Sequence, residues 1–181
     1  MPRSSARPLL LVDGYNIIGL WSKLKTKRDL DGLEASRREL IESLINYSAF
    51  EGLDTLVVFD AHSRHEPSYT EVISKSLSVC YTDFGQTADT YIEKTCATFR
   101  RNLGNLHRRL IVATSDRAQQ QTVLGYGAEW MSALQFAQSI EATERRCRSK
   151  QKTRNQPSSR FLVSGLDAEA QQRLAQLRRG L

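Results

Sequence analysis

Three short apolar runs, each leading to an aspartate, constrain the fold of this chain more than any other feature. The runs and the aspartates that follow them are Leu9–Val12 with Asp13, Leu56–Phe59 with Asp60, and Leu110–Ala113 with Asp116. Continuous apolar runs of this length are typical of strands buried on both faces, as in parallel sheets. Because ligands bind beyond the carboxyl ends of parallel strands, we expect the three aspartates in one crevice at that edge.

Helical segments are expected between these strands. Apolar residues recur at helical spacing over Leu30–Phe50, with Asp29 or Asp31 as the N-cap and Gly52 after the end. This alternation of strands and helices predicts an α/β fold with a parallel central sheet and helices on both faces. The remaining expected helices are Ala88–Leu103, Arg117–Leu124 and Ser132–Arg148, and the remaining expected strands are Leu77–Tyr81 and Glu129–Met131.

The chain has 181 residues, a length that suits one domain with a small appendage. Residues 149–160 are polar and basic and contain Pro157, which is typical of a linker. Beyond them, Asp167–Arg179 has the spacing of a helix too short to be stable unless it docks. We therefore expect a domain over 1–144, a basic linker over 145–165, and a C-terminal helix over 166–181 docked on the domain.

Several features bear on the compartment. No apolar run approaches the ~18 residues of a membrane helix, which excludes a transmembrane function. The first residues lack the long apolar run and the cleavage site of a signal peptide. The cysteines Cys80, Cys96 and Cys147 have neither zinc-site spacing nor the even number of a disulfide framework, which indicates reduced thiols. We expect a cytoplasmic protein, with an organelle stroma as the alternative.

The positive charge of the chain is concentrated near its C-terminal end. The formal net charge is +6, and seven basic residues without any Asp or Glu lie between Arg145 and Arg160. Without those seven, 19 basic residues face 20 acidic ones. Such a stretch predicts contact with a polyanion, and a solvated helix end is the alternative. The residues expected to contact a nucleic acid are Arg145, Arg146, Arg148, Lys150, Lys152 and Arg154.

Two further carboxylates accompany the strand-ending aspartates. Asp89 lies at the start of an expected helix, and Glu93 lies one turn further on the same face. Each aspartate alone is commonly a helix cap or a turn residue. Gathered at one sheet edge, however, carboxylates repel one another unless a cation compensates them. Oxygen donors without a His or Cys cluster favour Mg²⁺ or Mn²⁺, an ion that activates water for displacement at a phosphodiester.

Two other chemistries that begin at a strand end are less favoured. A dinucleotide-binding fold needs G-x-G-x-x-G after its first strand, and residues 13–17 do not supply it. An aspartyl-phosphate phosphatase usually carries a general acid two residues after its nucleophile, and Tyr15 occupies that position.

Four motifs in order carry a resemblance to a known family. They are D-G-Y-N-I-I from Asp13, V-F-D-A-H ending at His62, T-A-D-x-x-I-E around Asp89, and A-T-S-D ending at Asp116. Over roughly Leu9 to Glu144 the chain resembles the NYN domains, a branch of the PIN-like nucleases, and specifically their YacP branch. The terminal extension is also similar.

The resemblance implies a three-layer PIN-like fold and a metal-dependent endoribonuclease that cleaves mRNA in association with the translating ribosome. RNA and the ribosome are therefore the expected partners, and no membrane contact is expected. The resemblance implies these roles: Asp13, Asp89 and Asp116 hold Mg²⁺ or Mn²⁺, Asn16 and Asp60 support the metal or the phosphate, and Glu93 either supports the site or pairs on its own helix.

Other residues near these motifs have two interpretations each. Tyr15 and Trp21 either stack on bases or are buried, and His62 either contacts RNA or lies on the surface. Arg37 and Arg38 are expected on a solvated helix face, although one of them could reach the acidic cleft.

Two alternative functions stay open from the sequence. One is a non-catalytic RNA-binding or ribosome-binding module with a degenerate nuclease site, against which the four intact aspartates argue. The other is a nuclease that acts on DNA or on structured RNA, because phosphodiester chemistry is common to both polymers. The sequence predicts neither the oligomeric state, nor the native metal, nor the RNA preference.

Overall fold

A computed structural model describes residues 6–61 and 67–155, with the backbone alone at 152–155. The chain divides into two compact units, residues 1–144 and residues 145–181. No helix in the described ranges is long and apolar enough to cross a membrane. The sheet, its two cores and the expected site residues other than the basic stretch all belong to the first unit.

A six-stranded sheet forms the centre of this unit, in the order β3–β4–β2–β1–β5–β6. Its strands are β1 (Leu9–Asp13), β2 (Asp54–Phe59), β3 (Tyr69–Ser74), β4 (Leu77–Tyr81), β5 (Leu110–Ala113) and β6 (Glu129–Met131). All neighbours pair in parallel except β3 and β4. The predicted parallel sheet thus carries one antiparallel strand at its edge, which the sequence analysis did not predict. The two-residue link from β3 to β4 permits only an antiparallel hairpin.

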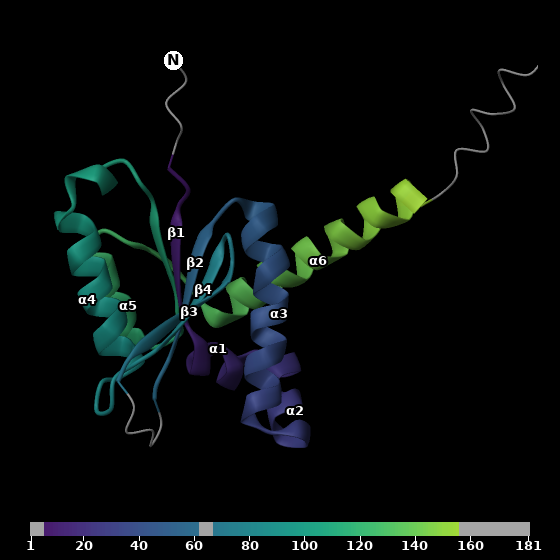
Figure 1. Cartoon of the computed structure of the whole chain (residues 1–181), viewed down its shortest axis with the longest axis horizontal. Coiled ribbons are helices and arrows are strands. Elements are labelled where there is room, and N and C mark those ends of the chain that lie inside the picture. The colour runs from purple at the N-terminus through teal and green to yellow at the C-terminus, as the bar shows by residue number, and fades with distance from the viewer. Residues whose placement is uncertain (1–5, 62–66, 156–181) are drawn as a thin grey trace, which may run out of the picture. The chain divides into compact units, whose positions relative to one another are not determined.

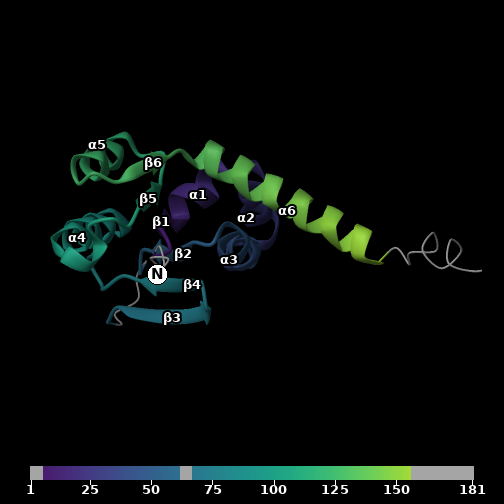
Figure 2. The ribbon, with the colours of Figure 1, turned by 90° about the horizontal axis from the view of Figure 1, so that it is seen from above.

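Helices cover both faces of the sheet, which confirms the predicted α/β class. Figures 1 and 2 show α4 and α5 on one side and α1 to α3 on the other. The helices are α1 (Gly14–Leu20), α2 (Ser22–Asp31), α3 (Leu33–Glu51), α4 (Ala88–Arg101), α5 (Arg117–Gly125) and α6 (Ala133–Asn155), and a 3₁₀ turn spans Leu103–Asn105.

Side-chain alternation along β1 divides the interior into two cores. Leu10 and Val12 face the core that α1 to α3 and the start of α6 cover, whereas Leu11 faces the core beneath α4 and α5. All three side chains are almost fully buried. The central strand is thus apolar on both faces, as its uninterrupted apolar run predicts.

The first crossover differs from the sequence-based expectation. A helix begins directly at Gly14, where a turn was expected, and residues 30–50 do not form one helix. Gly32 adopts a positive φ of 90° and separates α2 from α3, so neither Asp29 nor Asp31 caps the long helix. Only glycine adopts this conformation without strain, which is why the chain bends there.

The last described helix also differs. α6 was expected to end at Arg148, but it continues to Asn155, into the segment expected to be a linker. No proline or glycine interrupts this stretch before Pro157. The rest of the expected linker and the C-terminal helix lie outside the described residues, so that division of the chain stays a prediction.

Gly14 allows α1 to start close to β2. A Cβ atom at this position would overlap the ring of Phe59, the last residue of β2, whose side chain is fully buried. The close approach places the first turn of α1, and with it Asp13 and Asn16, against the end of the neighbouring strand.

We expect Gly14→Ala to lower the free energy of unfolding by about 1–3 kcal/mol, because the added methyl group must displace a buried ring. Chemical denaturation measures this change. Gly19→Ala is the matched control in the same helix, because nothing lies within 4 Å of its added Cβ. It should be neutral or slightly stabilising. Equal stability of the two variants would contradict the proposed close approach.

Candidate functional site

The predicted aspartates gather at the carboxyl edge of the sheet. Asp13 is the last residue of β1, Asp60 follows β2, and Asp116 lies just beyond β5. The chain runs from β1 to β2 on one side and returns to β5 on the other, so β1 and β5 flank the switch point of the sheet. Ligands of open α/β sheets bind at such a point.

Asp13 is nearly buried, with 7% of its surface exposed. It caps α1, and its Oδ1 accepts the backbone N–H of Asn16 at 3.2 Å. The amino end of a helix favours a negative charge, which offsets part of the cost of burying this carboxylate.

Asn16 ties the two sides of the switch point together. Its Oδ1 accepts the backbone N–H of Ser115 at 2.8 Å. The amide therefore holds the loop after β5 against the first turn of α1. Asn16 was predicted to support a metal or a phosphate. In the structure, its side chain instead accepts a hydrogen bond from the protein backbone.

Asp60 and Asp89 meet at the start of α4. The Oδ1 of Asp60 accepts the backbone N–H of Ala88, the first residue of the helix. Thr87 is the N-cap of α4, which leaves Asp89 in the first turn without a capping role. Asp89 instead accepts a 2.6 Å hydrogen bond at Oδ1 from the Nε2 of Gln119.

Asp116 caps α5 and is exposed. Its Oδ1 accepts the backbone N–H groups of Ala118 and Gln119 at 2.8 and 3.0 Å. The structural role considered for Asp116 from the sequence is therefore confirmed. Its place beside the other carboxylates adds a second, electrostatic role.

Burial raises the pKa of Asp13 from 3.8 to about 7. The N–H of Asn16 opposes the shift, and the charges of Asp89, Asp60 and Asp116 add to it. The pKa of Asp89 is also raised, first by burial and then by Asp116, Asp60 and Glu93. No ion pair in the described ranges involves any of the four aspartates. The site is thus crowded with negative charge.

The donor chemistry of the site fits a hard divalent cation. Asp13, Asp60, Asp89 and Asp116 each spend Oδ1 on a hydrogen bond within the protein, and their Oδ2 atoms accept none from the residues described. Oxygen donors of this kind suit Mg²⁺ or Mn²⁺. The described residues contain no group of three or more His, Cys, Asp or Glu placed to hold a metal ion. The expected convergence of Asp13, Asp89 and Asp116 is therefore not seen in this arrangement.

Gln119 is a site residue that the sequence analysis missed. It is 2% exposed, and its Oε1 is buried without a hydrogen-bond partner among the described residues. A buried amide oxygen of this kind is costly, so the residue is not explained by packing alone. Gln119 lies three residues after Asp116 and therefore about one helical turn from it. This spacing is the sequence signal that could have identified Gln119 as a site residue.

Arg37 was considered from the sequence, but its contacts were not predicted. Its guanidinium donates to the hydroxyl of Tyr15 at 3.2 Å, pairs with Glu34, and lies over the ring of Tyr81. The expectation of a solvated face for Arg37 was wrong, since 14% of its side chain is exposed. Arg38 is exposed, as expected.

The structure decides between the interpretations of several other residues. Trp21 is buried, and its Nε1 donates to Glu141 at 3.0 Å, so it presents no face to a base. Tyr15 is half-buried against Phe59, with 5.0 Å between ring centroids. Glu93 forms no ion pair in the described part of the chain. His62 lies outside the described residues.

The basic residues of α6 lie in the second unit. Arg145, Arg146, Arg148 and Lys150 are exposed on the helix. Nothing is described of the side chains of Lys152 and Arg154, so their predicted RNA contact stays a prediction.

Comparison with known proteins gives one consistent match. The family model of the YacP-like NYN domain matches residues 10–179. The uncharacterized protein YacP of Bacillus subtilis (strain 168) is 34% identical over 158 residues, which cover 86% of this chain and 89% of that protein. The crystal structure of Rae1 (YacP) from the same organism aligns with a TM-score of 0.66 and 33% identity over 95% of both chains. A mutant of that protein aligns with a TM-score of 0.65 and 35% identity, covering 83% of this chain and 86% of that one.

The raised pKa of Asp13 predicts a pH dependence of stability without divalent cations. The folded state keeps a proton on Asp13 between pH 3.8 and about 7, where the unfolded state has lost it. This contribution to the free energy of unfolding is therefore lost as pH rises through that window, by at most about 4 kcal/mol.

Asp13→Asn should weaken this dependence by removing the contribution of Asp13, while that of Asp89, whose pKa is also raised, remains. The variant should also be more stable than the wild type at pH 8. Urea unfolding at pH 5 and pH 8 in EDTA measures it. Asp31→Asn, an exposed substitution at the end of α2, should keep the wild-type profile. If Asp13→Asn kept the pH dependence of stability of the wild type, the carboxylate of Asp13 would not have the raised pKa described here.

Proposed function

Because this chain belongs to the family of YacP-like NYN domains, we propose that it is a divalent-metal-dependent endoribonuclease. Family membership by itself implies a nuclease-like function related to RNA. The proposal adds the metal, the internal cut, and mRNA at the translating ribosome as the substrate. The last of these rests on the family resemblance alone.

One observation carries the proposal of a metal. Asp13 is nearly buried, and three further carboxylates raise its pKa, yet no cationic side chain in the described ranges pairs with any of them. Replacing one of these carboxylates by a neutral side chain would remove the repulsion and stabilise the protein. Their presence therefore indicates that the charge has a function. Binding of a divalent cation is the use that fits oxygen donors at the switch point of the sheet.

The proposed ligands are Asp13, Asp89 and Asp116, with Asp60 and Asn16 holding the surrounding backbone. When bound, Mg²⁺ or Mn²⁺ would activate water and stabilise the charge of the phosphodiester during displacement. Gln119 fixes the orientation of Asp89, and the start of α4 fixes Asp60. Asp13 must lose its proton to reach full charge, so affinity for the cation should increase as pH rises through about 7.

A non-catalytic RNA-binding module is the second candidate. It is favoured by one observation, namely that no three acidic, His or Cys side chains among the described residues are placed to hold a metal ion. The two functions differ in one measurable property, since only the nuclease shortens RNA in the presence of Mg²⁺ or Mn²⁺.

We expect Asp13→Asn and Asp89→Asn to abolish cleavage of a single-stranded RNA in Mg²⁺ or Mn²⁺. The amide keeps the volume of the side chain and removes the charge that binds the cation. Neither variant should be less stable than the wild type without metal, because each loses repulsion. Gel analysis of a labelled RNA and a matched DNA measures the activity and the polymer preference, and circular dichroism checks the fold.

Asp29→Asn, on the exposed surface of α2, is the matched control and should cleave like the wild type. Wild-type rates in both site variants would contradict the catalytic assignment. An inactive wild type that still binds RNA would favour the non-catalytic module.

The basic stretch should act on affinity rather than on chemistry. Replacing Arg145, Arg146 and Arg148 by Gln should weaken binding of single-stranded RNA and flatten its salt dependence by about 0.7 per lost phosphate contact. Cleavage at saturating RNA should change little, because no proposed metal ligand is altered. An unchanged salt slope would indicate a solvated helix surface, and lost turnover with unchanged binding would indicate a role in the active site.

A further inference from the structure

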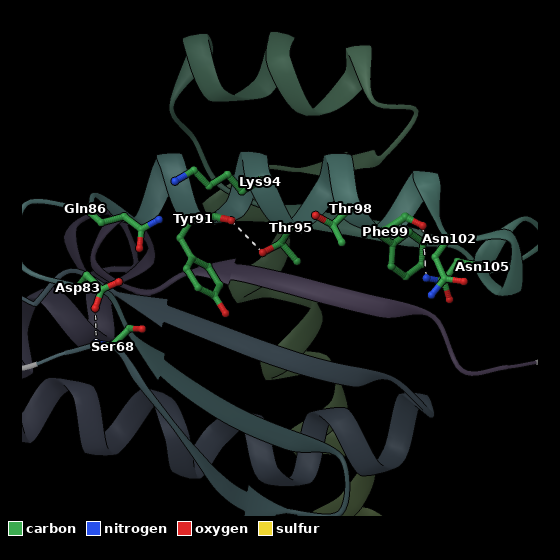
Figure 3. Close-up of a pocket in the computed structure, with 10 residues that line it drawn as sticks. All are labelled: Ser68, Asp83, Gln86, Tyr91, Lys94, Thr95, Thr98, Phe99, Asn102 and Asn105. Carbon is green, nitrogen blue, oxygen red and sulfur yellow. Dashed lines mark hydrogen bonds between the residues drawn. The ribbon is translucent and has the colours of Figure 1, made fainter.

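A groove begins at the carboxylate site and runs along α4. Its first part has a volume of about 300 Å³ and is lined by Asp60, Phe84 and Thr87 among others. Its second part, of about 480 Å³, continues between α4 and the sheet (Figure 3). Asp83 and Gln86 line both parts, so the two hollows adjoin.

The figure shows the direction of the groove. Gln86 and Asp83 lie near the carboxyl end of the sheet, and Asn102 and Asn105 lie at the opposite end of α4 (Figure 3). The helix has 14 residues, about 21 Å of length. A strand in the groove would therefore leave the carboxylates at one end and follow the helix for its full length.

We propose that this groove binds the single-stranded RNA next to the bond to be cleaved. The inference rests on the proposed function, whose carboxylate site supplies the starting point of the groove. It adds a binding track made of residues of the first unit, none of which belongs to the basic stretch.

The wall of the groove presents both donors and acceptors. The Oδ1 of Asn102 accepts the N–H of Gly104 at 2.9 Å, which leaves its amide N–H groups as donors. The Nδ2 of Asn105 donates to the carbonyl of Phe99 at 3.3 Å, which leaves its Oδ1 as an acceptor. Thr98 adds an exposed hydroxyl. Such a mixture suits the edges of unpaired bases and the ribose 2′-hydroxyl better than it suits a simple anion.

The groove is acidic at the end where the carboxylates lie and lacks acidic residues further along α4, where the phosphates of a bound RNA would follow. Residues 94–115 contain no Asp or Glu, in contrast to the carboxylates at the other end. Arg100, Arg108 and Arg109 are bound to carbonyl or carboxylate groups of the protein. Lys94 and Arg101 are exposed and pair with no carboxylate in the described ranges. Of the two, Lys94 lines the groove and can contact phosphates beyond the cleaved one.

Aromatic side chains lie at two points of this path. Phe84 is 61% exposed in the hollow beside Asp60, and Tyr91 is half-buried in the middle of the groove. Bases of single strands stack on such rings without regard to sequence. A polar groove with one exposed and one half-buried ring, and with a gradient from acidic to basic, therefore fits single-stranded RNA.

The test measures RNA binding in EDTA, where no cleavage can occur, by the fluorescence anisotropy of a short unstructured RNA. Phe84→Ala should weaken binding about tenfold at every salt concentration, because stacking does not release counterions. Lys94→Gln should weaken binding and also reduce the salt slope by about 0.7. The two substitutions thus have different signatures.

Matched controls lie on α2, on the other face of the sheet. Leu30→Ala removes an exposed apolar side chain, and Lys25→Gln removes an exposed charge. Both should bind RNA like the wild type. Wild-type affinity in both groove variants would overturn the inference, and so would equal losses in the controls.

A cross-linking experiment does not depend on any substitution. RNA carrying 4-thiouridine should cross-link to peptides within residues 84–105 of the wild-type protein. Cross-links confined to residues 145–160 would overturn the inference.

In Mg²⁺, the groove variants should raise KM and leave kcat close to the wild-type value. Failure of the proposed function looks different from failure of the groove. If the wild type does not cleave RNA but the groove variants still lose affinity, the binding track stands and the nuclease proposal fails. If the wild type cleaves and the groove variants keep wild-type KM and affinity, the nuclease proposal stands and the binding track fails.

Discussion

Burial of one carboxylate at the junction of β1 and α1 is the constraint on which the rest of the site depends. Asp13 is placed there because β1 is the central strand and α1 begins without an intervening turn. The N–H of Asn16 satisfies one of its oxygens, but three neighbouring carboxylates oppose its charge. The edge of the sheet therefore holds free energy that binding of a cation would release.

The loops at this edge are held by hydrogen bonds that link successive elements. Asn16 bonds the loop after β5, Asp60 bonds the start of α4, and Gln119 joins α5 to Asp89. Each bond joins two different elements or loops, so the carboxylates are fixed by the protein itself. Preorganisation of this kind lowers the cost of ordering a site when its ligand binds.

Acidic residues are unevenly distributed over the first unit, which the net charge of the chain does not show. The carboxylates at the edge of the sheet repel a polyanion unless a bound cation neutralises them. Residues 94–115, in contrast, contain no acidic side chain. An RNA strand that follows α4, as proposed, would therefore be close to acidic side chains at the end where cleavage is proposed. In the proposed RNA complex, the basic residues of the second unit would add affinity but no sequence specificity, because phosphate contacts carry no sequence information.

The sequence alone determined the α/β class, five of the six strands, and the aspartates at the carboxyl edge, because apolar runs and their ends are local properties. It did not determine the antiparallel β3, the break at Gly32 or the extent of α6, since a hairpin direction, a positive φ and the end of a polar helix depend on their surroundings. Only the tertiary structure decided the roles of Gln119 and Arg37. Both are polar residues on helices whose partners lie far away in the sequence, so only packing brings Gln119 to Asp89 and Arg37 to Tyr15.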